Sequence, residues 1–170
     1  RIPNLFRKFF AEGAFSAAFI PLLTEKNEKY GLQAGVAFTS NIASLLLFIV
    51  IPLIILSEFF MPGIVNFIAP GFINDIERLE LAIPYARIVF PYLVFIIFTA
   101  LFASALNTSG RFWSGAAAPV ILNVFLIIAL IISIYFDKDT GIIMCWAVLL
   151  AGVFQMLILT WANFKNGLSF

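Results

Sequence analysis

The chain has 170 residues, of which 63% are hydrophobic and only 11% charged, and its net charge is +1. Soluble domains are closer to half apolar and a quarter charged, so this composition excludes an ordinary soluble fold and predicts a membrane protein that binds no nucleic acid. With no histidine and one cysteine, the chain cannot supply a histidine-dependent catalytic site, a histidine-ligated metal site or an internal disulfide. Because it opens on Arg1 rather than Met, we expect an internal piece of a longer protein.

The charged residues punctuate long neutral runs. About 20 apolar residues in a helix cross the hydrocarbon core of a bilayer, and four neutral runs reach that length. A fifth candidate, at the start of the chain, is interrupted by three charged residues. Helices are required because backbone polar groups inside lipid need partners within their own segment. The sequence therefore predicts five transmembrane helices, at about 3–24, 36–60, 84–106, 116–136 and 142–164.

The first of these spans carries an unusual set of polar residues. Four of them recur at every fourth position and form a slowly drifting stripe on one face of a helix: Asn4, Lys8, Glu12 and Ser16. Arg7 lies about 60° from Asn4 around the helix axis. Ionisable residues in membrane helices usually face a bundle interior or a water-filled cavity. An arginine fork also suits a phosphate better than a lysine does, which makes an anion-binding site on Arg7 one hypothesis.

A second interpretation of the same residues needs no ligand. Arg7 and Lys8 are near the end of the span, where long basic side chains extend to the interface. Lys8 and Glu12 are also spaced for an ion pair within the helix. The residues leave both interpretations open. The sequence has no glycine-rich phosphate loop, acidic metal motif or paired catalytic carboxylates in a plausible site, so we expect no metal and no cofactor.

The connection after the second span has a pattern of its own. Asn74 is followed three residues later by Glu77, as in a helix-starting capping box. Apolar residues then recur at helical spacing opposite charged ones. This predicts a short amphipathic helix at about 73–82, lying at the membrane interface; a loop with a single helical turn is the alternative.

The remaining spans contain few residues that point to a ligand. We interpret Arg87 as an end residue that extends to the interface, and Asn123 and Gln155 as donors or acceptors of hydrogen bonds between helices. Bends are expected where proline interrupts the helical hydrogen bonds, at Pro52, Pro91 and Pro119.

The basic residues of the short loops favour one orientation. Four lie on the side of the 25–35 loop and two on the side of the 62–83 loop, which places the first side in the cytoplasm. The basic residues at the start of the first span then fall on the outer side, against the rule. Either the orientation is reversed or these cations are held there for a purpose.

Residues 3–25, PNLFRKFFAEGAFSAAFIPLLTE, resemble the second transmembrane helix of the MurJ/MviN family, the lipid II flippases of bacterial peptidoglycan synthesis. The chain matches the pattern P-N-L-x-R-[RK]-x-x-A-E-G-A-F-S-x-A-F-x-P-x-x-x-E at every fixed place. The resemblance covers nearly the whole chain and corresponds to about the second to the sixth helix of the family. Further matches follow in the same order: APGF at 69–72, FPY at 90–92, LNTSGRF at 106–112 and APVILN at 118–123.

The resemblance implies an all-α polytopic membrane protein, with residues 1–170 forming part of the N-terminal lobe of a two-lobed exporter fold. That fold belongs to the multidrug/oligosaccharidyl-lipid/polysaccharide exporter superfamily. The implied function is transport, not catalysis: alternating access carries lipid II, an undecaprenyl-pyrophosphate-linked disaccharide-pentapeptide, from the cytoplasmic to the outer leaflet of the bacterial inner membrane.

The resemblance also implies roles for individual residues. Arg7 matches an essential family arginine, one of the cavity arginines that engage the pyrophosphate, and the polar residues beside it complete the implied site: Asn4, Lys8, Glu12 and Ser16. The implied partners are lipid II, the bilayer and the remaining helices of the full-length chain. The first helix and second lobe are absent from this sequence, so the fragment alone is not expected to transport.

Two other functions remain in view. An exporter of the same superfamily could carry another polyprenyl-pyrophosphate-linked saccharide or a drug, but the AEGAFS motif argues against it. A membrane-embedded enzyme acting on prenyl phosphates would need clustered acidic metal ligands or a general base. Only Glu12 is acidic at membrane depth, which disfavours that function.

Overall fold

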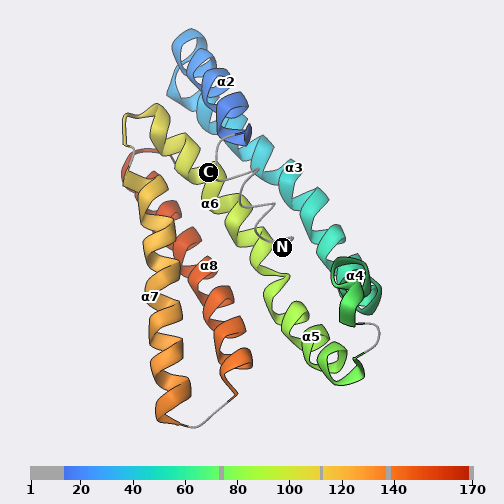
Figure 1. The fold of residues 1–170 in the computed structure, drawn as a ribbon. Helices are drawn as coiled ribbons and strands as arrows, with labels where there is room; N and C mark the ends of the chain where they lie inside the picture. The colour runs from blue at the N-terminus through green and yellow to red at the C-terminus, as the bar shows by residue number, and fades with distance from the viewer. Residues whose placement is uncertain (1–13, 73–74, 112, 137–138, 169–170) are drawn as a thin grey trace.

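The chain is helical throughout the part that the computed structural model describes, which comprises residues 14–72, 75–111, 113–136 and 139–168. The long helices run up and down beside one another (Figure 1). Short turns join most of them, and the 3-10 turn η1 (Pro70–Phe72) lies between α4 and α5. The α-helices are α2 (Ala14–Tyr30), α3 (Leu32–Phe59), α4 (Met61–Ile68), α5 (Ile76–Val89), α6 (Tyr92–Thr108), α7 (Trp113–Tyr135) and α8 (Thr140–Lys165).

Within the described residues, four helical stretches are long and apolar enough to cross a membrane, which makes the chain a multi-pass membrane protein. Each overlaps one of the last four spans predicted from the sequence. The first predicted span, 3–24, is described only from residue 14 onward, where it forms the start of α2. The four stretches are Leu32–Phe59, Ile76–Thr108, Ala116–Tyr135 and Thr140–Lys165.

The segment between the second and third predicted spans is more helical than the sequence indicated. It contains α4, which the sequence analysis did not anticipate, and α5 continues to Val89 instead of ending near residue 82. The cap of α5 is Asp75, whose carboxylate accepts a 3.2 Å hydrogen bond from the backbone N–H of Arg78. Asn74, the expected cap, lies outside the described residues.

Pro91 interrupts the helical hydrogen bonds of its span, as the sequence predicts. It occupies the cap position at the start of α6, where α6 follows α5 within one stretch, Ile76–Thr108. A proline ring has no N–H to donate and clashes with the preceding turn, whereas the start of a helix tolerates both effects. The chain therefore breaks at Phe90–Pro91 and resumes as α6, and α5 and α6 together form one interrupted span.

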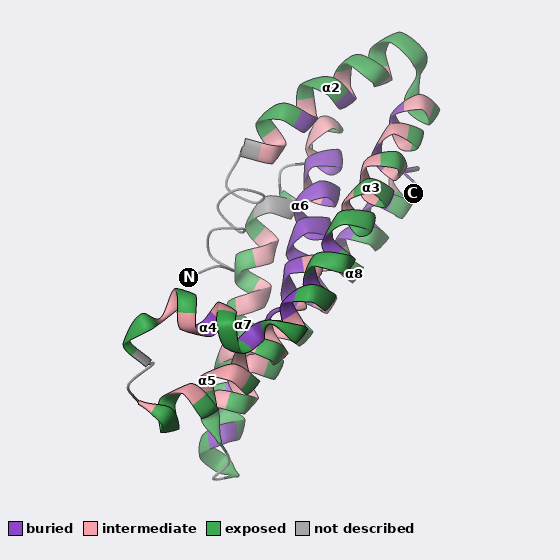
Figure 2. Cartoon of the chain, turned by 90° about the vertical axis from the view of Figure 1, so that its right-hand side faces the viewer, coloured by how far each residue is buried: buried purple, intermediate pink, exposed green. Residues whose placement is uncertain are grey.

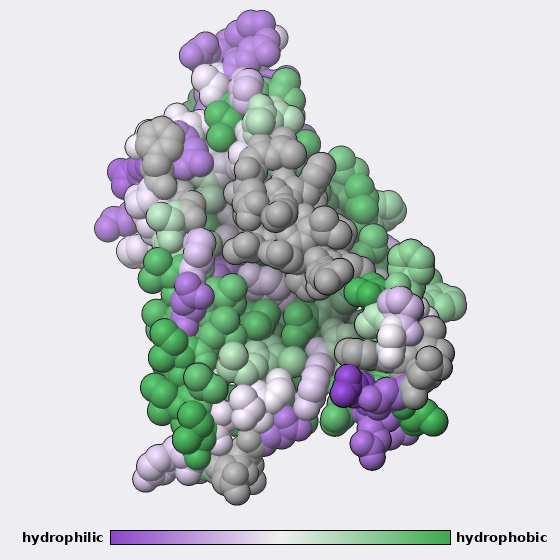
Figure 3. Space-filling view, in the orientation of Figure 1, coloured by the Kyte–Doolittle hydropathy of each residue, from purple (hydrophilic) through white to green (hydrophobic). Residues whose placement is uncertain are grey.

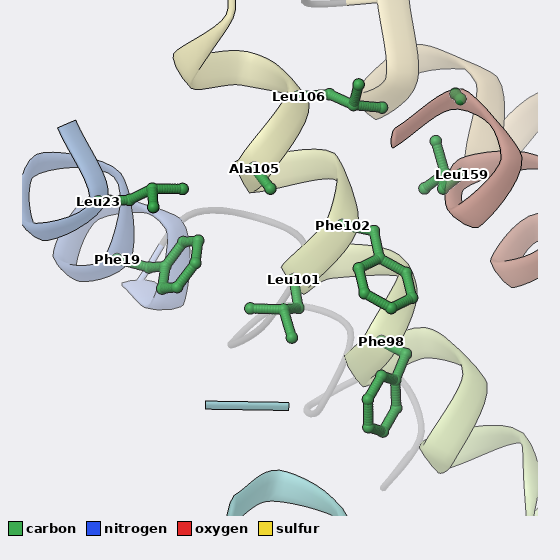
Figure 4. Close-up of a cluster of buried hydrophobic side chains, with 9 residues drawn as sticks. Phe19, Leu23, Phe98, Leu101, Phe102, Ala105, Leu106 and Leu159 are labelled. Carbon is green, nitrogen blue, oxygen red and sulfur yellow. The ribbon is translucent and has the colours of Figure 1, made fainter. Parts of the chain in front are cut away.

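Helix α6 is the centre of the molecule. It packs against α8, α2 and α3, and most of its residues are buried (Figure 2). Leu101, Ala105 and Leu106 are completely inaccessible to solvent. In Figure 4, Phe19 and Leu23 of α2 approach α6 from one side while α8 lies on the other.

Polar residues gather at the two ends of the bundle and apolar residues cover its sides (Figure 3). The α2–α3 turn, the α6–α7 turn and the end of α8 lie at one end, and the start of α5 and the α7–α8 turn lie at the other (Figure 1). The predicted orientation groups the loops in the same way. We call the end that holds the α2–α3 turn, the α6–α7 turn and the end of α8 the basic end, because more of the loop lysines and arginines lie there.

Candidate functional site

The candidate site predicted from the sequence lies mostly before the first described residue. Ser16, on α2, is the one member that the structure describes. The other four lie outside the described residues, so their positions and contacts stay predictions: Asn4, Arg7, Lys8 and Glu12. The contacts of Ser16 show which way its face of α2 points.

Ser16 forms a hydrogen bond between helices. Its Oγ lies 2.8 Å from the Oγ of Ser104 on α6. Ser104 is fully buried and donates its own hydroxyl proton to the carbonyl oxygen of Ala100, 2.8 Å away. A hydroxyl has one proton to donate, so Ser16 is the donor and Ser104 the acceptor. The Ser16 face of α2 therefore points to the bundle interior, as an inward-facing polar stripe requires.

Apolar contacts hold the same face of α2 in place. Phe19 and Leu23 are buried against Leu101 and Ala105 of α6 (Figure 4). The ring of Phe19 also stacks on Phe15, with centroids 5.3 Å apart and planes inclined by 15°. Because Ser16, Phe19 and Leu23 lie within about 60° of one another around a helix, the hydrogen bond and the apolar cluster fix one orientation of α2.

Sequence reasoning missed Ser104. A signal was present, since Ala100 and Ser104 form a small-xxx-small pair of the kind that lets membrane helices approach closely. A serine in an apolar span is ambiguous, however, because its hydroxyl often bonds only to its own helix. In this chain Ser104 does both.

The single polar residues deeper in the bundle have mostly structural contacts. Gln155 donates to the carbonyl oxygen of Ala118 at 2.7 Å, which confirms the predicted hydrogen bond between helices. Asn123 differs: it is exposed on α7 and has no hydrogen bond to any described residue. The sequence analysis overlooked Asn163, which is completely buried on α8 and donates to the carbonyl oxygen of Phe102 on α6 at 3.1 Å.

Arg87 has a partner that the sequence did not indicate. Its Nε lies 3.9 Å from the carboxylate oxygen Oε2 of Glu58, at the end of α3. Both side chains are partly exposed, so the pair is a weak electrostatic link between α3 and α5. Within the described ranges, no three histidine, cysteine or acidic residues are grouped to hold a metal ion.

A comparison with known protein families identifies the family of this chain. A family model described as Lipid II flippase MurJ matches residues 1–170, the entire chain. The chain belongs to the MurJ family. Its all-helical fold agrees with this membership, because a solved structure titled "Lipid II flippase MurJ, inward closed conformation" superposes with a TM-score of 0.80. That structure is 32% identical, and the alignment covers 96% of this chain and 34% of the other.

Relatives in the MurJ family give the same picture. A protein from Rhizobium tropici named "Probable lipid II flippase MurJ" is 40% identical over 162 residues, which cover 93% of this chain and 30% of the relative. One of the same name from Rhizobium meliloti is 38% identical over 170 residues, covering 98% of this chain and 32% of the relative. The chain thus spans about a third of the length of the curated relatives it matches.

Proposed function

We propose that the full-length protein containing this chain is a lipid II flippase of the bacterial inner membrane. The observation that carries the proposal is the match of all 170 residues to the MurJ family. The chain would contribute part of the N-terminal lobe, with α2 lining the path of the substrate. The inward direction of Ser16 supports that placement, because Ser16 belongs to the same polar stripe as the proposed site.

The proposed mechanism rests on the charge of the substrate. The pyrophosphate of lipid II is anionic, and the fork of Arg7 can form two parallel charge-assisted hydrogen bonds to it. Asn4 and Lys8 supply further donors. Ser16 belongs to the same stripe, with its hydroxyl proton donated to Ser104. Glu12 pairs with the cations in the empty state and releases them to the substrate. Substrate binding drives alternating access only because it contacts one state better than the other.

A complementation experiment tests the proposal. The full-length protein is expressed in cells depleted of their own lipid II flippase, as wild type and as Arg7→Ala. We expect rescue by the wild type and none by Arg7→Ala at an equal level in the membrane. The matched control is Arg78→Ala, which removes an exposed arginine that pairs with Asp75 at the start of α5 and should leave rescue intact.

The possible outcomes test the role of Arg7 and the identity of the transported lipid separately. Rescue by Arg7→Ala at the wild-type level would contradict the role of the arginine but not the cargo. Failure of a well-inserted wild type would contradict lipid II as the cargo and point to another polyprenyl-pyrophosphate-linked saccharide.

A further inference from the structure

Helices α5 and α6 belong to one span, yet they are packed very differently. None of the 14 residues of α5 is buried, whereas 12 of the 17 residues of α6 are (Figure 2). Apolar side chains of α5 such as Leu79 and Ile83 are only partly covered, by a cluster that includes Met61 and Leu93. Segments with few buried contacts open at a lower free energy than the core does, so α5 is the part of this span that moves most easily.

The two helices meet at a junction that lacks a full set of α-helical hydrogen bonds. Pro91 has no N–H, so it cannot donate to the carbonyl oxygen of Arg87 as another residue would in an unbroken helix. After the proline, the N–H of Leu93 donates to the carbonyl oxygen of Phe90, three residues back, at 3.1 Å. The N–H of Val94 donates to Pro91 in the same way, also at 3.1 Å. The bend between α5 and α6 can therefore change here at a lower cost than within either helix.

One polar contact holds α5 against α8. The hydroxyl of Tyr85 lies 3.0 and 3.1 Å from the two carboxylate oxygens of Asp139 and donates its proton to this carboxylate. Asp139 also caps α8, because one of its oxygens accepts from the backbone N–H of Gly141 at 2.8 Å and of Ile142 at 3.3 Å. The contact therefore ties α5 to the start of α8, at the end of the bundle opposite the basic end (Figure 1).

The start of α8 also fits the ring of Tyr85. A β-carbon at Gly141 would lie 2.6 Å from the Tyr85 hydroxyl oxygen and from the ring carbon that bears it. Glycine at this position therefore lets the ring reach the Asp139 carboxylate. A second polar link from α5, between Arg87 and Glu58 on α3, is 3.9 Å long and partly exposed, so it is the weaker restraint.

We propose that Phe90–Pro91 is a hinge and that the Tyr85–Asp139 contact is a latch that holds α5 against α8. In this structure the latch is closed. When it opens, α5 swings away from α8 about the hinge, while α6 and α8 stay packed together. A hydrogen bond to a charged group shifts such an equilibrium by about tenfold, so the latch sets the share of molecules in which α5 is released. The device does not depend on which lipid the full-length protein transports.

Distances between spin labels in the full-length protein, measured by pulsed electron paramagnetic resonance, test the latch. The labels are attached at Glu77→Cys on α5 and Leu150→Cys on α8, two exposed positions. The native cysteines, Cys145 among them, are first replaced by alanine. Gly141→Ala should add a second, longer distance, because its methyl group displaces the Tyr85 ring even though alanine favours the helix itself.

A second variant removes only the hydrogen bond. Tyr85→Phe keeps the ring beside α8, and we expect the ratio of the longer to the shorter distance to rise about tenfold over the wild type. The matched control is Tyr135→Phe, which removes the hydroxyl of an exposed tyrosine at the end of α7 and should leave the ratio unchanged. A second label pair, Ile127→Cys on α7 with Leu150→Cys, should keep its distance in every variant.

Three results would overturn the proposal. The wild-type distance distribution in both latch variants would mean that the contact does not restrain α5. A longer distance in the control variant as well would mean that the effect does not come from the latch. If the second label pair lengthens together with the first, the helices separate as a whole, and the junction between α5 and α6 is not the hinge.

Discussion

Helices α3 and α6 have nearly the same apolar character and opposite positions in the molecule. Of the 17 residues of α6, 12 are buried within the chain, against 5 of the 28 residues of α3. Along α3 only a narrow seam is covered, at Gly35, Thr39, Val50, Ile54 and Ser57. Large side chains such as Phe48 and Phe59 stand about four-fifths exposed.

The difference lies in small and polar residues. The buried surface of α6 includes Ala100, Ser104 and Ala105, which let neighbouring backbones approach, and its partners include Gly152 and Asn163 on α8. Inside a membrane, lipid tails compete equally well for large apolar side chains, so close packing and hydrogen bonds decide which helix is central. Hydropathy identifies a spanning helix, and its small and polar residues identify its place in the bundle.

The largest test of this comparison is a matched pair of truncations. Leu101→Ala, at a fully buried position of α6, should cost about 3 kcal/mol of unfolding free energy, because a cavity is left in a packed core. Leu45→Ala, on the exposed face of α3, should cost less than about 1 kcal/mol. Reversible unfolding of the full-length protein in detergent measures both. Equal losses would show that α3 is packed as closely as α6.

A second test adds a methyl group to the close contact between α6 and α8. A β-carbon at Gly152 would lie 2.5 Å from a ring carbon of Tyr92 and 3.0 Å from Phe95, both on α6. We expect Gly152→Ala to cost about 2 kcal/mol, because overpacking forces α6 and α8 apart.

The control for Gly152→Ala is Gly63→Ala on α4, where a β-carbon meets nothing within 4 Å. That change should be neutral or stabilise the protein by up to about 1 kcal/mol. The same unfolding measurement compares the two variants. A tolerated Gly152→Ala would mean that α6 and α8 are less closely packed than the structure indicates.

The smallest expected loss of unfolding free energy is that of replacing the buried amide of Asn163. Asn163→Ala removes the donor to Phe102 and Leu159 carbonyl oxygens, and hydrogen bonds between membrane helices contribute about 1 kcal/mol. Asn123→Ala, at the exposed amide of α7, should change stability by less than about 0.5 kcal/mol. Similar losses for the two variants in the same unfolding experiment would show that burial against α6 does not distinguish the amides.

The sequence predicted the spans better than their packing. Charged residues mark the ends of α7 and α8, so neutral runs located these helices closely. The same reasoning failed for α5, because Arg78, Glu80 and Arg87 interrupt the neutral run without ending the helix, and Pro84 lies inside it. Hydropathy also could not tell α6 from α3, since burial depends on which faces meet in three dimensions.

The candidate site was partly predictable for a similar reason. The spacing of Ser16 with the other stripe residues indicated its face, and the structure supports that direction. Its partner Ser104 lies 88 residues away in the chain, and no local pattern connects the two. The contact becomes visible only once α2 and α6 are packed together.

The most direct test of the proposed function is a translocation assay in vesicles. The full-length protein is reconstituted with fluorescent lipid II in one leaflet, and the appearance of the label in the other leaflet is followed over time. The wild type should move lipid II. Arg7→Ala should move it at least about tenfold more slowly, because a charge-assisted contact to the pyrophosphate is lost. Equal rates for the two proteins, or no movement by a correctly inserted wild type, would contradict the account.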